Sequence, residues 1–459
     1  MDLNRKRVLV VGLGRSGIAA AQLCAARGAR VTVTDRREWS ALGAALAGLP
    51  TSIARELGGH RRETFTSAEL IVLSPGVAEI PELAAARAAG VAITGEIELA
   101  SRFVSGTLIA ITGTNGKSTT TTLVGDIMRA TGRPTFVGGN LGDPLAEAVG
   151  TAAAAPGGAC VVEASSFQLE TADTFRPQVA VLLNITADHL DRYADMDAYA
   201  AAKARIFAAQ TANDNAVVNL DDDLAVAVSN DVPGRRLGFS VTRPLSEGAW
   251  LGAEGGDDGL MVRLPDGPAE RYPAILPGLV GRHNQANALA ALLAGRLAGA
   301  TPAQARSALL AFRPLAHRME LVAETGGVAY YDDSKGTNVG AVVASLEGFP
   351  RPVVLIAGGR DKGGDYAPLA AVLQKFGRAA ILIGEAADKI ETALRGVVPV
   401  ERAATMDGAV NAARRLAQPG DAVVLSPACS SFDMFRDYGH RAEVFRAAVA
   451  HIAAGGQSS

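Results

Sequence analysis

The chain has 459 residues, a formal net charge of −3 and 48% hydrophobic residues. At roughly 150 residues per domain, this length predicts about three domains. Acidic and basic residues are mixed along the whole chain, which argues against a nucleic-acid or membrane surface and favours small-molecule partners.

Cysteine usage and the N-terminus both point to the cytoplasm. Cys24, Cys160 and Cys429 are an odd, scattered set without the C-x-x-C spacing of a zinc site, so we expect free thiols in a reducing compartment. The opening "MDLNRKRVLVVGLG" has too short an apolar run for a signal peptide, and no stretch approaches the ~20 apolar residues of a membrane span.

Short β-branched runs alternate with alanine-rich stretches, a rhythm that predicts parallel α/β sheets covered by helices on both faces. A first block runs from the strand at Val8 through "GLGRSG", a helix ending near Arg27, "RVTVTD" and "LIVLSPG". A second opens at Leu108 with the strands "ACVVE" and "VAVLLN", and its glycine-rich insert from about Arg235 to Arg271 predicts a small antiparallel meander. A third block follows, with the strands "GVAYYDDS", "PVVLIAGG", "AAILIG" and "DAVVLSP".

These blocks predict an α/β protein of three domains, bounded at 1–104, 105–314 and 315–459. We expect an N-terminal Rossmann-like sheet, a central P-loop ATPase-like sheet carrying the antiparallel insert, and a C-terminal Rossmann-like sheet. In such open sheets ligands collect at the carboxyl ends of the strands, where most of the unusual polar clusters of this sequence lie.

The first such cluster, "GLGRSG", has the G-x-G-x-x-G spacing of a dinucleotide fingerprint, with Asp35 at the end of the next strand. It is equally compatible with a nicotinamide or flavin enzyme and with a plain tight turn between strand and helix. The glycines permit close approach of a phosphate to a helix N-terminus, so they indicate an anion but not the nucleotide that carries it.

The second cluster, "ITGTNGKST", is a phosphate loop with Ile111 in place of the first glycine. Backbone N–H groups from Gly113 to Lys117 can cradle phosphate oxygens, Lys117 can reach a terminal phosphate, and the Ser118 hydroxyl can bind Mg²⁺. The alternative is a helix start capped by Thr114 or Asn115, which would not require Gly-Lys-Ser together.

Two strand ends near this loop carry candidate metal ligands. Glu163 ends "ACVVE", where its carboxylate can hold Mg²⁺; the alternative is an exposed acid at a strand end. His189 follows "VAVLLN" beside Asp188 and Asp191, a cluster that suits a divalent ion or a phosphate, although a lone histidine at such a place is more often a hydrogen-bonded loop residue.

The loop "GTNGKST" resembles that of the Mur ligases and their folylpolyglutamate synthetase relatives. Six further clusters extend the resemblance along nearly the whole chain: "EASSFQLE", "NITADHLDRY", "GRHNQANALAA", "HRME", "DDSKGTN" and "SPACSSFDMF". Their order is that of the branch that adds D-glutamate, and the D-N-P-R signature of the diaminopimelate-adding branch is absent from the sequence.

The resemblance implies an ATP-dependent ligase that joins D-glutamate to UDP-N-acetylmuramoyl-L-alanine through an acyl phosphate, during cytoplasmic synthesis of peptidoglycan precursors. It also implies ATP and two Mg²⁺ ions as cofactors, and we expect a monomer. The first domain would bind UDP, the second ATP and the third the amino acid, with closure of the third domain onto the second excluding water.

The family pattern assigns residues of this chain to each part of the reaction. The implied catalytic residues are Lys117, His189, Lys203 and Arg318. The implied ATP-binding residues are Gly113, Thr114, Asn115, Gly116, Lys117, Ser118, Thr119, Asn284, Asn287, Arg318 and Asp333. The implied metal ligands are Ser118, Glu163, His189 and Lys203. The implied residues for the UDP substrate are Gly14, Arg15, Ser16, Asp35, Arg36, Ser74, Gly76, Asn140 and His189. The implied D-glutamate residues are Lys335, Thr337, Lys362, Ser431 and Tyr438.

For some of these residues, the chemistry of the side chain also supports the implied role. Asn284 and Asn287 lie three residues apart and could pair with the adenine edge, although Asn284 could instead cap its helix. Arg318 follows a proline-bearing junction, Phe312 to Leu315, from which it could swing onto the γ-phosphate. Asp333 would bind the ribose.

At Lys203 and around Tyr438, the local sequence and the family resemblance disagree. Lys203 lies in the alanine-rich "MDAYAAAKARIFAAQ", where the ordinary interpretation is a solvated surface lysine, whereas the resemblance implies a carbamylated lysine that binds Mg²⁺. In "FRDYGHRAEVF", Tyr438, Gly439 and Ala442 depart from the D-glutamate pattern. Tyr438 still provides an aromatic ring, but the pattern no longer predicts that the backbone there contacts glutamate.

Two other classes of protein remain alternatives at this stage: a nicotinamide oxidoreductase built on "GLGRSG", and a nucleotide-hydrolysing switch. A Mur-type ligase for another amino acid is a third.

Overall fold

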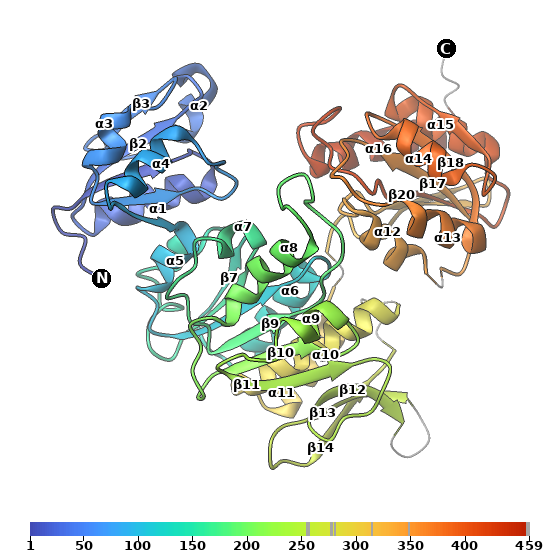
Figure 1. Cartoon of the computed structure of the whole chain (residues 1–459). Coiled ribbons are helices and arrows are strands. Elements are labelled where there is room, and N and C mark those ends of the chain that lie inside the picture. The colour runs from blue at the N-terminus through green and yellow to red at the C-terminus, as the bar shows by residue number, and fades with distance from the viewer. Residues whose placement is uncertain (254–257, 276–278, 280, 314, 348, 456–459) are drawn as a thin grey trace. The chain divides into compact units, whose positions relative to one another are not determined.

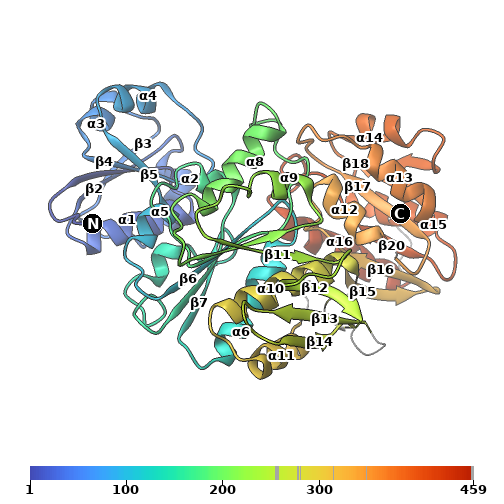
Figure 2. The same ribbon diagram turned by 60° about the horizontal axis from the view of Figure 1, so that its bottom comes forward.

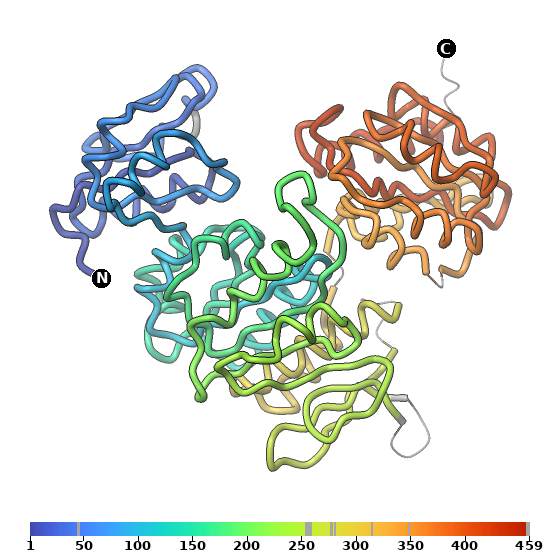
Figure 3. The backbone as a smooth tube through the Cα atoms, in the orientation of Figure 1, coloured from blue at the N-terminus to red at the C-terminus, as the bar shows by residue number. Residues whose placement is uncertain are grey.

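The computed structural model describes residues 1–253, 258–275, 279, 281–313, 315–347 and 349–455 (Figure 1). These residues form three β-sheets, of five, nine and six strands, in two compact units. The first unit comprises Met1–Asn184, Ala200–Leu276 and Gln285–Phe312, and the second comprises Ile185–Tyr199, Pro277–Asn284 and Arg313–Ser459. Figure 3 follows the backbone from the blue N-terminal sheet to the orange and red C-terminal sheet.

The five-stranded sheet is entirely parallel, with the order β3-β2-β1-β4-β5. Its elements are β1 (Arg7–Val11), α1 (Arg15–Ala26), β2 (Arg30–Asp35), α2 (Trp39–Leu46), β3 (Ala54–Leu57), α3 (Arg62–Ser67), β4 (Leu70–Leu73), α4 (Pro81–Ala88) and β5 (Ala92–Gly95). The turn after β1 requires glycine, because Gly12 has φ +87° and a Cβ on Gly17 would lie 1.9 Å from the Gly12 carbonyl oxygen. The predicted Rossmann-like arrangement is confirmed.

The nine-stranded sheet has the order β14-β13-β12-β11-β10-β9-β6-β8-β7. Its strands and the neighbouring helices are α5 (Glu96–Ser101), β6 (Thr107–Thr112), α6 (Lys117–Ala130), β7 (Thr135–Gly139), η1 (Leu145–Ala148), β8 (Ala159–Glu163), α7 (Ser166–Leu169), β9 (Val179–Leu182), α8 (Met196–Ala204), η2 (Arg205–Phe207), β10 (Asn215–Asn219), α9 (Asp223–Ala227), β11 (Arg235–Ser240), β12 (Gly248–Ala253), β13 (Asp258–Arg263), β14 (Ala269–Pro273), α10 (Arg282–Leu297) and α11 (Pro302–Ala311). Helices α6, α10 and α11 pack together (Figure 2), and Gly295 of α10 lets that helix come close to Ile127 of α6.

The antiparallel insert is confirmed, but it is smaller than predicted. Strand β11 pairs in parallel with both β10 and β12, so it extends the main sheet, and only β12, β13 and β14 form the meander. The prediction that the meander begins near Arg235 was wrong because a glycine-rich, polar edge of a parallel sheet resembles a hairpin in sequence.

The six-stranded sheet has the order β15-β16-β20-β17-β18-β19, and all its strands are parallel except β15. Its elements are β15 (Glu320–Thr325), β16 (Val328–Asp332), α12 (Val339–Leu346), β17 (Val353–Gly358), α13 (Ala367–Phe376), β18 (Gly377–Ile383), α14 (Ala387–Leu394), β19 (Val400–Arg402), α15 (Met406–Leu416), β20 (Ala422–Leu425) and α16 (Tyr438–Ala453). Val353 and Leu355 of β17 enter one apolar core, while Val354 and Ile356 enter another on the opposite face. Both faces of this sheet are therefore covered, as a buried parallel sheet requires.

Two further features bear on the sequence predictions. All three cysteines are free and buried. Among the helices of the described residues, none combines the length and apolar character needed to cross a bilayer.

Candidate active site

The phosphate loop joins β6 to α6 and is built around two glycines. Gly113 has φ +156° and Gly116 has φ +84°, and Gly116 occupies the N-cap position of α6 without any side-chain cap. The alternative of a helix capped by Thr114 or Asn115 is therefore wrong. A left-handed glycine at this point aims the first N–H groups of the helix outward, as an anion site requires.

Asn184, which follows β9, holds this loop in place. Its carbonyl oxygen accepts a hydrogen bond from the Thr114 N–H at 2.9 Å, and its side-chain oxygen accepts one from the Asn115 N–H at 2.8 Å. Two of the five N–H groups predicted to cradle phosphate are thus already engaged. The groups from Gly116 onward, where a helix leaves its N–H groups unbonded, are the better phosphate donors.

Two lysine ammonium groups converge on the loop. Lys117 Nζ donates to the carbonyl oxygens of Gly113 and Thr114, both at 2.8 Å, and Lys203 Nζ donates to the same Gly113 oxygen at 2.8 Å. Lys203 is only 1% exposed, so the alternative of a solvated surface lysine is wrong. The Lys117 ammonium gives the loop positive charge, which suits a polyphosphate.

Glu163 ends β8, the strand beside β6, and is 3% exposed, so the alternative of an exposed acid at a strand end is wrong. Its Oε1 accepts a hydrogen bond from Asn140 Nδ2 at 2.8 Å, whereas Oε2 is buried without a hydrogen-bond partner among the described residues. Such a carboxylate oxygen is costly to bury unless a cation or donor meets it. With the buried hydroxyl residue Ser118 at the start of α6, the oxygen donors fit a hard divalent cation.

Helix α10 carries both predicted adenine residues. It begins at Arg282, so Asn284 lies inside the helix and is not its cap. Asn287 is 6% exposed, and its side-chain oxygen would lie 2.2 Å from a Cβ placed on Gly116. Asn287 therefore packs directly against the phosphate loop, which explains why that position must be glycine.

A cavity of about 440 Å³ lies at the switch point of the five-stranded sheet, where β1 and β4 meet. It is lined by five of the predicted UDP residues, namely Gly14, Asp35, Arg36, Ser74 and Gly76, together with Arg37 and His60. This position at the carboxyl edge is where open α/β sheets bind nucleotides.

Asp35 organises this cavity. Its Oδ2 accepts hydrogen bonds from the Leu13 N–H and the Arg37 guanidinium, both at 2.7 Å, and its Oδ1 also faces Arg37. Burial would raise the pKa of Asp35, but these hydrogen bonds outweigh it and lower the pKa to about 2. The ionised carboxylate therefore fixes the glycine turn.

Three other predicted UDP residues lie outside the lining of this cavity. Arg15 opens α1 and forms an ion pair with Asp143 at 2.5 Å, while Ser16 is the next residue and is partly exposed. Asn140 follows β7 and contacts Glu163.

His189, also assigned to the UDP substrate, belongs to the second unit, because Ile185–Tyr199 folds there. It has the unusual φ of +57°, its Nε2 lies 3.7 Å from Asp188 Oδ2, and its ring meets Tyr199 edge-on at 6.4 Å. Asp191 is exposed. The other predicted metal ligands belong to the first unit, so a shared site remains a prediction.

A second cavity, of about 340 Å³, lies within the second unit and contains an ion pair. Lys362 Nζ lies 3.1 Å from Asp188 Oδ1, and Asn338 Nδ2 donates to Asp188 Oδ2 at 3.1 Å. Asn338 is held in turn because its Oδ1 caps α12. A partly buried lysine beside a cavity suits a ligand carboxylate.

The other predicted glutamate residues follow neighbouring strands but do not line that cavity. Lys335 follows β16, and its Nζ lies 3.8 Å from the centre of the Tyr438 ring. Thr337 is partly exposed in the same loop, and Ser431 follows β20 and is 3% exposed. The loops after β17 and β20 are joined by the Arg360–Ser430 bridge.

Arg441 of α16 holds these loops in place through hydrogen bonds. It is fully buried and donates to the Ser334 side chain and carbonyl and to the Cys429 carbonyl. Burial lowers the pKa of Arg441 to about 10, so it remains a cation at neutral pH. Ser334 in turn donates to the Tyr438 carbonyl, which fixes the start of α16 where the sequence departs from the D-glutamate pattern.

Asp333 is buried at the end of β16 and accepts hydrogen bonds from Ser426 Oγ at 2.6 Å and from the Met319 N–H at 3.3 Å. Burial raises the pKa of Asp333 to about 6, and the Arg318 charge partly offsets this. The two residues predicted to bind the ribose and the γ-phosphate are thus electrostatically coupled in one unit.

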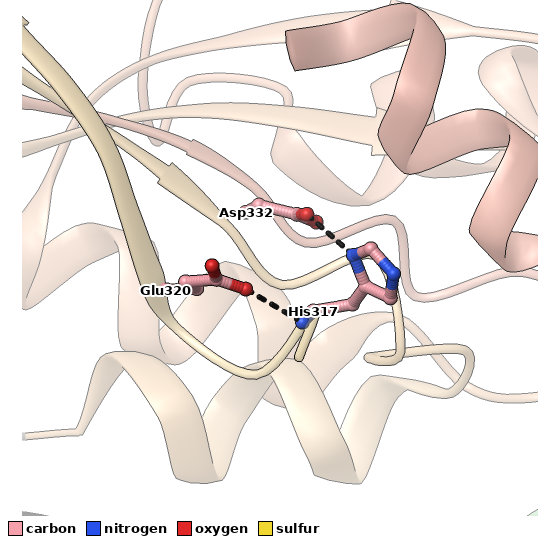
Figure 4. A group of neighbouring side chains, drawn as sticks. All are labelled: His317, Glu320 and Asp332. Atoms are coloured by element: carbon pink, nitrogen blue, oxygen red, sulfur yellow. Dashed lines mark hydrogen bonds and ion pairs between the residues drawn. The ribbon is translucent and has the colours of Figure 1, made fainter. Parts of the chain in front are cut away.

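A cluster of His317, Glu320 and Asp332 lies beside Arg318 (Figure 4). His317 Nδ1 lies 2.7 Å from Asp332 Oδ2, and the His317 N–H donates to Glu320 at 3.1 Å. Arg446 bridges the same two carboxylates, at 2.5 and 3.0 Å. Because the guanidinium already supplies the positive charge there, we assign this cluster to holding the Arg318 turn and not to binding a metal.

Sequence reasoning missed several residues that shape these sites. His60 lines the cavity of the five-stranded sheet, Asn184 holds the phosphate loop, and Arg441 supports the loops of the six-stranded sheet. A histidine or asparagine two or three residues after a strand was the available signal for the first two. An arginine within an otherwise apolar helix face was the signal for Arg441.

The family models for Mur ligases match nearly the whole chain. The model of the Mur ligase MurD-like N-terminal domain matches residues 6–95, that of the Mur ligase middle domain 111–295, and that of the Mur ligase glutamate ligase domain 317–429.

Curated relatives match over their full length. A Geotalea daltonii protein named UDP-N-acetylmuramoylalanine--D-glutamate ligase is 50% identical, and the aligned region covers 99% of this chain and 99% of its own. A Pelobacter propionicus protein of the same name is 49% identical and covers 98% of this chain and 99% of its own.

Solved structures share the fold at low identity. A pseudomurein peptide ligase type C from Methanothermus fervidus has a TM-score of 0.62 at 18% identity, covering 98% of this chain and all of its own. UDP-N-acetylmuramate-alanine ligase from Thermotoga maritima has a TM-score of 0.59 at 19% identity, with the same coverage.

Proposed function

The chain belongs to the Mur ligase family, and we propose that it joins D-glutamate to UDP-N-acetylmuramoyl-L-alanine at the expense of ATP. One observation carries the choice of amino acid: relatives named for this reaction match 98–99% of the chain, and so include all three domains. Mur ligases use ATP and Mg²⁺, and the reaction forms a carbon–nitrogen bond while releasing ADP and phosphate.

We assign the ATP phosphates to the loop from Gly113 to Thr119. The N–H groups at the start of α6 would receive them, and Lys117 would exchange its contacts with loop carbonyls for a terminal phosphate. Asn287, packed on Gly116, supports the placing of adenine near α10. The roles of Asn284, Arg318 and Asp333 remain predictions from the family pattern.

We assign the divalent cation to Ser118 and Glu163, because the buried Oε2 of Glu163 has no hydrogen-bond partner within the described part of the chain. A bound Mg²⁺ supplies positive charge where negative charge develops on phosphate oxygens. Lys203, His189 and a second ion complete the family pattern, and carbamylation of Lys203 is part of this proposal.

The chemistry follows from placing these groups around two substrates. The terminal carboxylate of the alanyl substrate attacks the γ-phosphorus to give an acyl phosphate, and Lys117 and Arg318 neutralise the charge that moves toward ADP. The amine of D-glutamate then displaces phosphate through a tetrahedral intermediate. The base that removes the amine proton has no assignment.

D-glutamate brings two carboxylates, so its pocket needs cations and hydroxyl groups. We assign Lys362 to one carboxylate because it lies in the cavity of the second unit. Lys335, Thr337, Ser431 and Tyr438 lie in neighbouring loops and remain predictions, as do binding of UDP in the cavity of the first sheet, the domain limits, a cytoplasmic location and the monomeric state.

Omission of single substrates tests the class of reaction. We expect phosphate release only when ATP, Mg²⁺, UDP-N-acetylmuramoyl-L-alanine and D-glutamate are all present, because the acyl phosphate forms on one substrate and is consumed by another. A coupled colorimetric assay of phosphate measures this directly. Steady ADP formation without an amino acid would indicate a nucleotide-hydrolysing switch, and NAD(P)H affinity without affinity for the UDP-sugar would indicate an oxidoreductase.

A further inference from the structure

Asn140 contacts Glu163 through both its backbone and its side chain. It directly follows β7, whose last residue, Gly139, lies opposite Glu163 in the parallel ladder. The Asn140 N–H donates to the Glu163 carbonyl oxygen at 2.9 Å, and Asn140 Nδ2 donates to Glu163 Oε1 at 2.8 Å. One residue is thus tied to the main chain and to the carboxylate of its neighbour.

The turn that brings Asn140 to this position depends on Gly139. Gly139 has φ +99°, and a Cβ there would lie 2.4 Å from the Glu163 carbonyl oxygen. A side chain would push β7 away from the end of β8 and remove Asn140 from reach. The local backbone is therefore shaped for this pair of hydrogen bonds.

The chemistry of the two groups fixes their roles. An ionised carboxylate only accepts hydrogen bonds, so the amide must present its NH₂ to Glu163 and turn its oxygen away. This bond engages Oε1 alone and leaves Oε2 buried without a hydrogen-bond partner among the described residues. Glu163 is held in one orientation with one oxygen reserved.

We infer that Asn140 is a positioning residue for the cation-binding carboxylate of Glu163, a role distinct from the contact with the UDP substrate that the resemblance implies. The inference rests on the proposed function in that it takes Glu163 as a metal ligand. Hydrogen-bonding partners of this kind orient metal ligands, and their loss typically weakens metal binding by about 10- to 100-fold. Asn140 is itself exposed, so its removal should not disturb a core.

Binding of Mn²⁺ alone, followed by electron paramagnetic resonance without nucleotide or sugar substrate, tests this inference. We expect Asn140→Ala to weaken Mn²⁺ binding by about 10- to 100-fold. Asn140→Ser, whose hydroxyl is too short to reach Glu163, should behave in the same way, and both variants should unfold at the wild-type temperature.

Two reference variants define the result. Glu163→Ala should abolish this Mn²⁺ binding. Asn219→Ala should leave it within about twofold, since Asn219 ends β10 and donates its amide to the Leu183 carbonyl instead. Wild-type Mn²⁺ affinity in both folded Asn140 variants, with a loss only of UDP-sugar affinity, would overturn the inference and leave the proposed function intact. Absence of Glu163-dependent Mn²⁺ binding in the wild type would overturn the metal assignment and the inference together.

Discussion

Replacing Lys203 with alanine should lower ligase turnover by about 10²-fold or more, and small carboxylates added in excess should restore part of it. Lys203 is buried, and its Nζ lies 2.8 Å from the Gly113 carbonyl oxygen of the phosphate loop. An ammonium there competes with a cation bound near Glu163, whereas an N-carboxylated lysine offers two oxygens that can bind the cation. Acetate or formate can occupy the space left by the shortened side chain.

Direct detection of the carbamate distinguishes a modified Lys203 from an unmodified lysine that only holds the phosphate loop by its hydrogen bond to Gly113. Wild-type protein equilibrated with ¹³C-bicarbonate should show a carbamate carbon signal by NMR, and Lys203→Ala should lack it. Lys375→Ala serves as the matched control, because Lys375 is an exposed lysine on another helix and should change neither activity nor the signal. Near-normal turnover of folded Lys203→Ala, with no carbamate signal in the wild type, would contradict the assignment.

Replacing Lys362 with alanine should raise the apparent KM for D-glutamate by about 10²-fold, which corresponds to losing a charge pair worth about 3 kcal/mol. The Lys362 side chain is 17% exposed and faces a cavity large enough for an amino acid. Its removal would also take the Lys362 ammonium away from the Asp188 carboxylate, so a ligand carboxylate would lose attraction and meet more repulsion. The KM for ATP should barely move.

The neighbouring Lys389 provides the control for this experiment. Lys389 forms an ion pair at 2.5 Å with Asp361, the residue that precedes Lys362. The Lys389 side chain is 67% exposed and does not line the cavity. Lys389→Ala should therefore leave both KM values within about twofold, because exposed ion pairs contribute little. Equal rises in KM for D-glutamate and ATP in Lys362→Ala would place Lys362 elsewhere in the reaction.

The parallel sheets and the ligand-bearing edges could be predicted because both depend on local sequence. Apolar runs such as Val353–Gly358 are buried on both faces, and the residue that follows such a run lies at the carboxyl edge. The phosphate loop, Glu163 and the glycine turn of the first sheet were found in this way. Strand β15 was missed because it is an edge strand with mixed polarity, and half-exposed strands lack a clear period.

Features that depend on contacts between distant segments could not be predicted from the sequence. The residues around Lys203 in its helix are mostly alanine, so the apolar pattern of the sequence does not indicate that Lys203 is buried. Asp188 was grouped with His189 and Asp191 by proximity in sequence, yet its carboxylate is bound by Lys362 and Asn338, which are more than 140 residues away. Tertiary pairing of this kind decides which oxygen remains available to a ligand.

The measurement that tests the central claim most directly is phosphate release with UDP-N-acetylmuramoyl-L-alanine and ATP across a panel of L- and D-amino acids. We expect D-glutamate to support the highest kcat/KM, with L-glutamate far below it, because a site built for one enantiomer cannot place the amine and both carboxylates of the other. Preference for L-alanine, L-lysine or another amino acid over D-glutamate would contradict it.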